Sequence, residues 1–238
     1  MQIYWTKINK IIDESPEVKT YMLDCPEGFT WEEGAHTHFA LEGFNAGEKP
    51  NRSLIRHMSI STLPYEDSIG ITTRIKDECS EFKTILLKHK VGDEVALFKT
   101  HSNVPLRREN KNVYFLSSGV GLATLRPLAL DYFNRADNVN HIHSLNIEST
   151  RDFLFTDIFE SAPDKKFTSQ FVDSRKEYYD EVKNLATDKD GLFYVVGSDE
   201  YIKQNIELLL DEGIKPEQIK LDKHKRQLSE FLSLDVSV

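Results

Sequence analysis

Residues 112–131 read NVYFLSSGVGLATLRPLALD, and this stretch decides the fold class. Its first part, Asn112–Ser118, is a short apolar run with aromatic and β-branched members, which predicts a buried strand. Gly119 and Gly121 then allow a tight turn, because glycine accepts positive φ and lets a ligand approach the backbone. A helix is predicted over Leu125–Phe133, with its proline in the first turn. Strand, Gly-x-Gly and helix together aim backbone N–H groups at a phosphate, but a plain strand-to-helix turn has the same pattern.

After this stretch, predicted strands and helices alternate along the chain. The longest of these helices carries Ile202, Ile206 and Leu209 on one face. Alternation of this kind implies a parallel sheet that helices cover on both faces. The strands are predicted at His141–Ile147, Phe167–Val172, Leu192–Val196 and Ile219–Leu221, and the helices near Asp152–Ser161, Glu177–Ala186 and Asp199–Glu212.

Before this stretch, the chain has the pattern of antiparallel β structure. Short apolar segments are separated by turn signals such as Asp13-Glu14-Ser15-Pro16, which favours a barrel or a sandwich. One helix is predicted directly after Ser80, and Phe82 and Leu86 lie on its apolar face. The strands are predicted at Gln2–Ile12, Val18–Asp24, His36–Leu41, Ile55–Ile60, Ser68–Ile75 and Asp93–Phe98.

The fold class predicted from both halves is β followed by α/β. An N-terminal antiparallel β-barrel domain precedes a domain with a parallel sheet and helices. The pattern of predicted elements changes from strands alone to alternating strands and helices near the polar stretch 106–112, where few apolar residues occur. We therefore predict a first domain of residues 1–108 and a second domain of residues 109–238.

Charge and composition exclude several classes of protein. The 238 residues carry a formal net charge of −9, whereas nucleic-acid binding usually needs a basic face. No apolar run is long enough to span a bilayer, and the first residues lack the apolar core of a signal peptide. Cys25 and Cys79 are too few for a disulfide framework or an iron–sulfur cluster, which fits a reducing cytoplasm. His36 and His38 alternate on a strand, but no carboxylate or cysteine partner is apparent, so no metal site is predicted.

The first stretch that carries chemistry is Arg56-His57-Met58-Ser59, on a predicted barrel strand. A guanidinium gives a permanently charged, bidentate grip on phosphate. Because side chains alternate between strand faces, Arg56 and Met58 share one side and His57 and Ser59 the other. The alternative is an ordinary strand with a surface arginine.

The second stretch is Arg74-Ile75-Lys76, followed by the helix that begins after Ser80 and carries Phe82 and Lys83. Basic residues ahead of a serine-capped helix make an anion site, because the helix start offers unpaired N–H groups. A solvated loop and a normal helix cap would give the same sequence.

A β-barrel, a parallel α/β domain and these motifs together resemble the ferredoxin–NADP⁺ reductase superfamily, in the form that has only flavin and nicotinamide domains. Arg56-His57-Met58-Ser59 matches the family's Arg-x-Tyr/Phe-Ser/Thr motif at the arginine and the serine, with Met58 at the aromatic position. The resemblance implies that the first domain binds FAD. Arg56 would hold the flavin pyrophosphate, and Ser59 would hydrogen-bond near flavin N5 as the catalytic residue. The segment from Ser80 to Leu86 matches the family's pyrophosphate segment.

The same resemblance assigns the second domain to NAD(P). The family motif Gly-Gly-x-Gly-x-Thr-Pro has its counterpart here in the segment from Ser118 through Gly119, Val120 and Gly121 to Leu122, Ala123 and Thr124. The family's Cys-Gly-Pro has its counterpart in Val196-Gly197-Ser198. The glycines are kept, while Ala123, Thr124 and Val196 depart from residues that lie near the nicotinamide in relatives.

The electron donor implied is NADPH or NADH, and two loops bear on the choice. Ser174-Arg175 resembles the Ser-Arg pair that grips the 2′-phosphate in NADP-specific relatives. Glu148 would repel that phosphate, and Arg151 could offset the repulsion. A helix cap followed by a solvated charge is the alternative for Ser174-Arg175, and the balance favours NADPH slightly.

The function implied is an FAD-dependent oxidoreductase that accepts hydride from NAD(P)H and passes electrons to a partner protein or a small acceptor. Two alternatives remain. One is the reductase component of a multi-chain oxygenase. The other is a non-enzymatic or catalytically impaired protein of this fold that binds a flavin or a nucleotide. The expected partners include no nucleic acid and no membrane, and the acceptor is not identified by the sequence.

Overall fold

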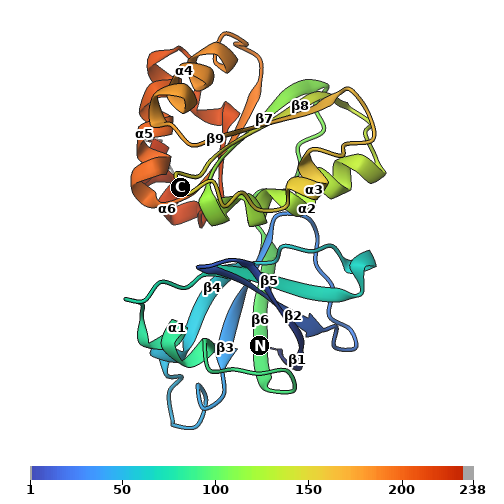
Figure 1. Cartoon of the computed structure of the whole chain (residues 1–238), viewed down its shortest axis with the longest axis vertical. Coiled ribbons are helices and arrows are strands. Elements are labelled where there is room, and N and C mark those ends of the chain that lie inside the picture. The colour runs from blue at the N-terminus through green and yellow to red at the C-terminus, as the bar shows by residue number, and fades with distance from the viewer. Residues whose placement is uncertain (1, 233–238) are drawn as a thin grey trace. The chain divides into compact units, whose positions relative to one another are not determined.

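The computed structural model describes residues 2–232, apart from the side chains of residues 225, 226 and 229. The chain divides into two compact units, Met1–Pro105 and Leu106–Val238 (Figure 1). The first is built from antiparallel strands and the second from a parallel sheet with helices, so the predicted fold class is confirmed.

The first unit is a six-stranded antiparallel sheet with the strand order β4-β3-β6-β1-β2-β5. An isolated bridge joins Ile60, just after edge strand β4, to Ile71 within the other edge strand, β5, which closes the sheet toward a barrel rather than a sandwich. Its elements are β1 (Ile3–Ser15), β2 (Val18–Asp24), β3 (Ala35–Leu41), β4 (Ile55–Ser59), β5 (Ser68–Arg74), α1 (Glu81–Leu86) and β6 (Glu94–Ser102), with 3₁₀ turns at Arg52–Leu54 and Pro64–Glu66.

Strand β1 serves both halves of the barrel because it changes partner along its length. Residues Ile3–Lys7 pair with β6, and residues from Ile8 onward pair with β2 after a register shift. The strand runs on to Ser15, so the turn predicted at 13–16 is reduced to residues 16 and 17. Alternate side chains such as Ile8, Tyr21 and Leu23 are buried in the barrel core.

Helix α1 contributes to the same core. Phe82 and Leu86 are fully buried, and the Phe82 ring lies 6.1 Å from that of Phe39, edge to face. Ser80 stands at the N-cap with extended dihedrals, but its side chain makes no capping hydrogen bond. The helix is therefore held by its apolar face, and the serine capping expected from the sequence is wrong.

The second unit is a five-stranded parallel sheet with the order β11-β10-β7-β8-β9. Tyr114 and Leu116 of β7 pack in a core with α4, α5 and α6, while α2 and α3 cover the other face (Figure 1). Its elements are β7 (Lys111–Ser118), α2 (Leu122–Asn134), β8 (Val139–Ile147), α3 (Thr156–Phe159), β9 (Phe167–Val172), α4 (Arg175–Leu185), β10 (Leu192–Val196), α5 (Asp199–Asp211), β11 (Ile219–Leu221) and α6 (Lys225–Leu232), with 3₁₀ turns at Gly119–Gly121 and Pro216–Gln218.

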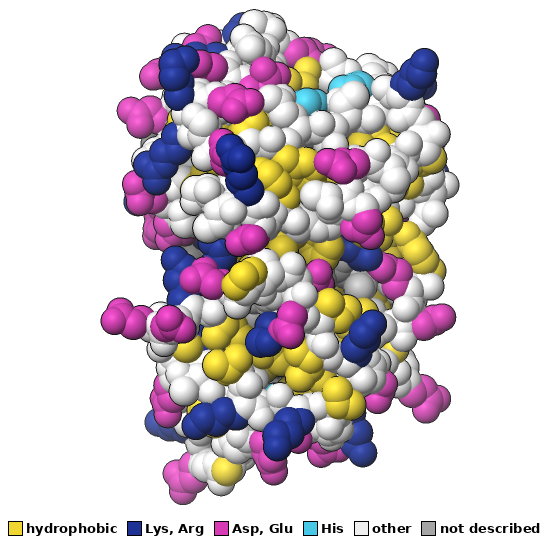
Figure 2. All heavy atoms as spheres, viewed as in Figure 1, with side chains coloured by type: hydrophobic (Ala, Val, Ile, Leu, Met, Phe, Trp, Pro, Cys, Tyr) yellow, Lys and Arg dark blue, Asp and Glu magenta, His cyan; other side chains and the backbone are white. Residues whose placement is uncertain are grey.

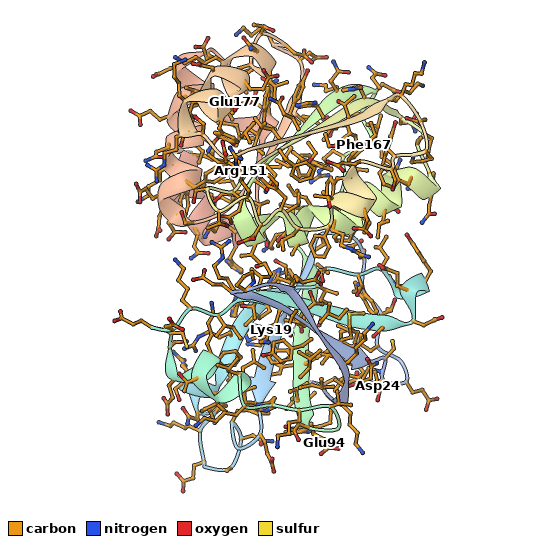
Figure 3. The ribbon with its side chains drawn as sticks, viewed as in Figure 1. Lys19, Asp24, Glu94, Arg151, Phe167 and Glu177 are labelled. Atoms are coloured by element: carbon orange, nitrogen blue, oxygen red, sulfur yellow. The ribbon has the colours of Figure 1, made fainter. Side chains whose placement is uncertain are left out.

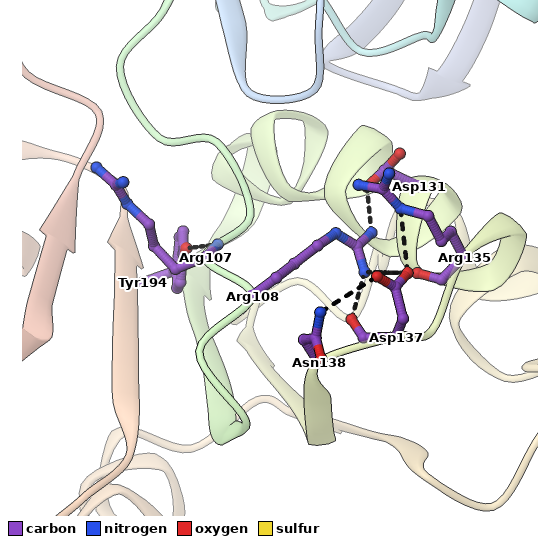
Figure 4. Close-up of polar contacts among 7 residues, drawn as sticks. All are labelled: Arg107, Arg108, Asp131, Arg135, Asp137, Asn138 and Tyr194. Carbon is purple, nitrogen blue, oxygen red and sulfur yellow. Dashed lines mark hydrogen bonds and ion pairs between the residues drawn. The ribbon is translucent and has the colours of Figure 1, made fainter.

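The first residues of this unit are anchored by polar contacts (Figure 4). The Arg107 backbone N–H donates to the Tyr194 hydroxyl at 2.8 Å. The Arg108 guanidinium pairs with Asp131 at 2.6 Å and donates to the carbonyl oxygens of Arg135 and Asp137 at 2.7 and 2.9 Å. The unit therefore starts at Leu106, whereas the sequence-based boundary follows residue 108.

Helices α2 and α3 differ most from their predicted bounds, and α6 was not predicted. Helix α2 starts at Leu122, so Pro127 lies in the second turn, where its missing N–H leaves no i→i−4 bond to Ala123. Helix α3 is only four residues long, within the predicted range 152–161. The basic run at 223–226 leads into α6, whose Leu232 is buried in the core. Among the described residues, no helix is long and apolar enough to cross a membrane.

The surface carries charges of both signs. In Figure 2, acidic and basic side chains are interspersed over the visible face.

Candidate functional site

In the first unit, Arg56 is held in a fixed orientation on β4. Its guanidinium carbon lies 5.1 Å from the centre of the Phe82 ring. Its Nη1 donates to the carbonyl oxygens of Arg52, Ser53 and Ile55 at 3.3, 3.2 and 2.7 Å. All three bonds use Nη1, so the backbone fixes the orientation of the guanidinium. Nη2 and Nε take no part in these three bonds. A guanidinium held in this way is ready to bind an anion with little loss of entropy.

Two further cations lie near Arg56. The Lys83 ammonium donates to the Arg74 carbonyl oxygen at 2.6 Å. Burial lowers the pKa of Lys83, Cys79 opposes that effect, and the charges of Arg56 and Arg74 lower the pKa further. The positive charges of Arg56 and Arg74 therefore act on Lys83, and Glu17 pairs with Arg74 at 4.0 Å. A bound anion would be attracted to this side of the barrel.

A cavity of about 790 Å³ opens beside Arg56 on the barrel. Four cationic side chains and four rings line it, and its described lining contains no carboxylate. Charge and shape therefore suit an anionic ligand with a planar ring. The lining residues are His38, Phe44, Lys49, Pro50, Arg52, Ile55, Arg56, His57, Phe98 and Lys99.

The cavity wall includes part of a cluster of four histidines. The His38 ring lies 4.0 Å from that of His57, and the His36 ring 4.2 Å from that of His101. Burial lowers the pKa of His38 to about 4, with help from His57 and Lys99, so His38 is neutral at pH 7. Among the described residues, no group of three or more His, Cys, Asp or Glu side chains is arranged so that it could hold a metal ion.

Other residues that the sequence singled out in this unit differ in their exposure to solvent. Met58 is 9% exposed and packs in the barrel core, so it presents little surface to a ligand. Ile75 is also buried in the core. Ser59 is partly exposed at the end of β4, opposite His36 in register. Lys76 and Ser80 are exposed.

In the second unit, the glycine turn follows the central strand of the sheet. Gly119 has a φ of +51°, which favours glycine. Gly121 has an ordinary φ of −57°, but a Cβ there would lie 2.5 Å from the Val196 carbonyl oxygen. The turn after β7 therefore packs directly against the end of β10, and Gly121 is required by that contact.

The end of β10 is shaped by Tyr201. A Cβ on Gly197 would lie 2.5 Å from the Tyr201 ring, and the Ser198 hydroxyl accepts the Tyr201 N–H at 3.2 Å. The hydroxyls of Tyr201 and Tyr178 are hydrogen-bonded, and Tyr178 donates to Asn205 at 2.9 Å. This buried network fixes α4 to the start of α5.

Helix α2 begins beside these two strand ends. Ala123 and Thr124, in its first turn, are 3% and 4% exposed, whereas Val120 is half-buried. Strand order reverses between β7 and β10, and parallel sheets bind ligands outside the carboxyl ends of strands at such a reversal. The glycine turn and Gly197 lie at this position.

The loops after β8 and β9 carry the remaining predicted residues. Glu148 is buried and accepts hydrogen bonds from the N–H and hydroxyl of Thr150 at 3.3 and 3.2 Å. Arg151 pairs with Asp173. Ser174 caps α4 by accepting the N–H of residue 177 at 3.4 Å.

No family model matches the sequence, and no curated protein matches it. Solved structures do match. A ferredoxin NADP⁺ reductase from Neisseria gonorrhoeae with bound FAD and NADP is 16% identical, with a TM-score of 0.73 over 93% of this chain and 98% of that one. The chain has the ferredoxin reductase-like fold. The CS-b5R domains of human Ncb5or in the NAD⁺ form are 14% identical, with a TM-score of 0.76 over 93% and 70% of the two chains. A Plasmodium falciparum ferredoxin-NADP⁺ reductase with 2′P-AMP is 16% identical, with a TM-score of 0.75 over 92% and 96%.

Within this ferredoxin reductase-like chain, the predicted residues form two groups. On the barrel, Arg56, Arg74, Phe82 and Lys83 come together, and the cavity adds His57. At the strand reversal, the glycine turn meets the end of β10. The sequence reasoning missed the rest of the cavity wall, His38, Phe44, Lys49, Arg52, Phe98 and Lys99, because these residues converge only through the pairing of β3 with β4 and β6.

Proposed function

We propose that this protein is an FAD-dependent oxidoreductase that takes hydride from NAD(P)H and passes electrons to a further acceptor. The observation that carries the proposal is the cationic, ring-lined cavity around Arg56. A fold whose solved examples include a reductase with bound FAD and NADP supports it. The residues present fit a flavin dinucleotide at its anionic end, because Lys83 and Arg74 add two cations beside Arg56.

On the flavin side, the chain's residues bind and orient. Bound FAD would supply the group that accepts hydride and stores two electrons. Arg56 would hold the pyrophosphate, with Lys83 and Arg74 adding positive charge. Ser59 would donate or accept a hydrogen bond near flavin N5. The further contacts proposed come from His57, Met58, Ile75, Lys76, Ser80 and Phe82.

On the nicotinamide side, the backbone of Gly119, Val120 and Gly121 would face the pyrophosphate of NAD(P)H, at the start of α2. Ala123, Thr124 and Gly197 would border the nicotinamide. NAD(P)H would supply a hydride from C4 of its dihydronicotinamide, and the bound flavin would take it up with both electrons. Ser174 and Arg175 would lie at the adenosine end, where the sequence favours NADPH slightly.

A second candidate is a protein of this fold that binds FAD without rapid turnover. The burial of Met58 favours it, because the position that would meet the flavin ring is packed in the core. The first candidate also includes the reductase component of an oxygenase, since one similar structure is a ferredoxin reductase in carbazole 1,9a-dioxygenase. The acceptor would then be a partner protein.

The test starts with the absorbance of the purified protein after incubation with FAD. We expect flavin bands that bleach when NADPH or NADH is added without air. Flavin bands that persist with both donors would support the second candidate. A colourless protein that does not take up FAD would contradict both. Adding ferric chelates, quinone or a candidate partner protein to the reduced form would then identify the acceptor class.

A further inference from the structure

We infer that the flavin ring bound by this chain lies against His57 and His38, and that Lys99 is the cation at its edge. The inference rests on the proposed function, because it concerns the flavin of that site. The family motif gives the ring to residue 58, but the Met58 side chain is packed in the barrel core here. A planar ligand therefore needs another surface on this strand.

Three rings form a row across one face of the first sheet. In register, His57 of β4 stands opposite His38 of β3, and His38 stands opposite Phe98 of β6. Residues directly opposite in antiparallel strands carry their side chains on the same face. The ring centres of His57 and His38 are 4.0 Å apart, and those of His38 and Phe98 are 4.9 Å apart. Phe44, from the loop after β3, extends the row, with its ring stacked on that of Phe98 at 5.6 Å.

The two imidazoles are the accessible part of this row, and all four rings line the cavity beside β4. His57 is exposed and His38 is half-buried, whereas Phe98 and Phe44 are buried. A ligand that enters the cavity therefore meets the imidazoles first. Burial, followed by the charges of His57 and Lys99, lowers the pKa of His38 to about 4. This ring is thus neutral at pH 7, so a planar ligand can cover it without desolvating a charge.

The neighbours of His57 on β4 suit the same placement. Because side chains alternate between strand faces, Ser59 shares the face of His57 rather than that of Met58. The resemblance gives Ser59 a hydrogen bond near flavin N5, which a ring on the His57 face would allow. Strand β4 is at the edge of the sheet, and Arg56 lines the same cavity as His57. One ligand can therefore meet the guanidinium with its anionic part and the imidazoles with its ring.

Lys99 stands at a backbone position that favours glycine. Strand β6 begins at Glu94 (Figure 3), and between its pairs with His38 and His36 it has two residues, Lys99 and Thr100, where β3 has one. Lys99 has a φ of +52° in this bulge. Strain of this kind persists where the surrounding structure fixes it, and it clusters at binding sites. The Lys99 side chain lines the cavity, where its ammonium can donate to the carbonyl oxygens of a flavin ring.

The experiment is calorimetric titration of the full chain with FAD and with FMN, which keeps the flavin ring but lacks the adenosine half. His57→Ala should weaken the binding of both by at least about fivefold, as for the loss of one aromatic side chain on which a base stacks. His57→Phe restores a planar face and should bring both affinities back to within about threefold of the parent. Lys99→Gly should weaken both by at least about threefold. Its melting temperature should not fall, because glycine accepts the positive φ.

The matched control is His89→Ala, which removes an imidazole of the same unit that is outside the cavity lining and should leave both affinities unchanged. An equal loss of affinity in His89→Ala and His57→Ala would overturn the inference. So would unchanged binding of both flavins by His57→Ala, or a larger loss of FMN binding in Met58→Leu than in His57→Ala. Unchanged affinities in Lys99→Gly would overturn the role given to Lys99.

The two flavins also decide which ring of FAD lies on the imidazoles. A loss of FAD binding without a loss of FMN binding in His57→Ala would place the adenine there and overturn the inference. Binding of FAD but not FMN by the parent protein would do the same, because the affinity would then come from the adenosine half. All of these results leave the proposed function standing. A parent protein that binds neither flavin would overturn the proposed function, and this inference with it.

Discussion

Replacing Gly121 with alanine tests the contact between the glycine turn and the end of β10. The φ of −57° at Gly121 is ordinary for alanine, and by itself such a change stabilises by about 0.4–1 kcal/mol through the unfolded chain. The added Cβ would, however, lie 2.5 Å from the Val196 carbonyl oxygen and 3.0 Å from its carbon. Both are backbone atoms, so the turn or the strand end must move. Overpacking of this kind costs about 1–3 kcal/mol.

The assay is thermal unfolding of the full chain, followed by circular dichroism. A loss of 1 kcal/mol lowers the melting temperature by about 2–4 °C for a domain of 150–250 residues, so we expect a fall of several degrees. The control compares the same substitution, glycine to asparagine, at Gly121 and at Gly213. Gly213 has a φ of +83° and no heavy atom within 4 Å of an added Cβ, and asparagine tolerates that conformation. Gly213→Asn should cost only the strain of a side chain at positive φ, whereas Gly121→Asn should cost more, because its Cβ meets backbone atoms of Val196.

Two results would refute the reasoning. One is a Gly121→Ala protein that melts within a degree of the parent. The other is equal destabilisation by asparagine at both glycines. If Gly121→Ala keeps the parent's stability but loses binding of ADP-ribose, then the glycine serves the ligand alone, as the sequence pattern by itself suggested.

Three further predictions concern single side chains. Arg56→Ala should weaken FAD binding by about ten- to a hundredfold, the value of one charge-assisted hydrogen bond, in a fluorescence titration, and Arg52→Ala in the same cavity should cost less. The free energy of unfolding in urea should fall as pH is lowered from about 6.5 to about 4. The pKa of His38 is about 4 in the folded chain and near 6.5 in the unfolded chain, so the unfolded chain binds more protons in that window. The variant His38→Gln should flatten this pH dependence. Tyr178→Phe should destabilise by about 1–3 kcal/mol in chemical unfolding, because it removes the buried donor to Asn205; Tyr179→Phe, at the half-buried surface, should cost less.

The strands were the most predictable part of this molecule. Each of the strands β1 to β11 was expected from its sequence, and most of the bounds agree to within one residue. The larger error, in β6, arose because the strand continues through the polar Lys99–Ser102. Those residues are held by pairing with β3, as Ala35 faces Ser102 and His36 faces His101. Cross-strand pairing of this kind is a tertiary property that a local pattern cannot express.

Residues of the candidate site could be proposed from the sequence only where the local stretch of chain itself indicates a role. Arg56 could be found because a guanidinium on a strand has few roles, whereas the four histidines converge from three strands. The register of those strands decides which imidazoles meet, and a slip of one residue would place them on opposite faces. The reason for Gly121 was likewise hidden, because Val196 lies far along the sequence and meets the turn only through the pairing of β7 with β10.

At the start of α2, the residues that differ from the family motif move a hydroxyl group as well as remove side chains. The family resemblance expects a threonine where Ala123 stands and a proline where Thr124 stands, so a hydroxyl is kept but is moved by one residue. One residue turns a side chain by about 100° around a helix axis. Ala123 and Thr124 are both buried at the base of the glycine turn, so the hydroxyl acts inside the unit rather than on its surface. A pyridine nucleotide at this strand end would meet backbone groups of Gly119 and Gly121 first. Such a site depends on the shape of the turn more than on side-chain donors, and that shape is what the contact between Gly121 and Val196 fixes.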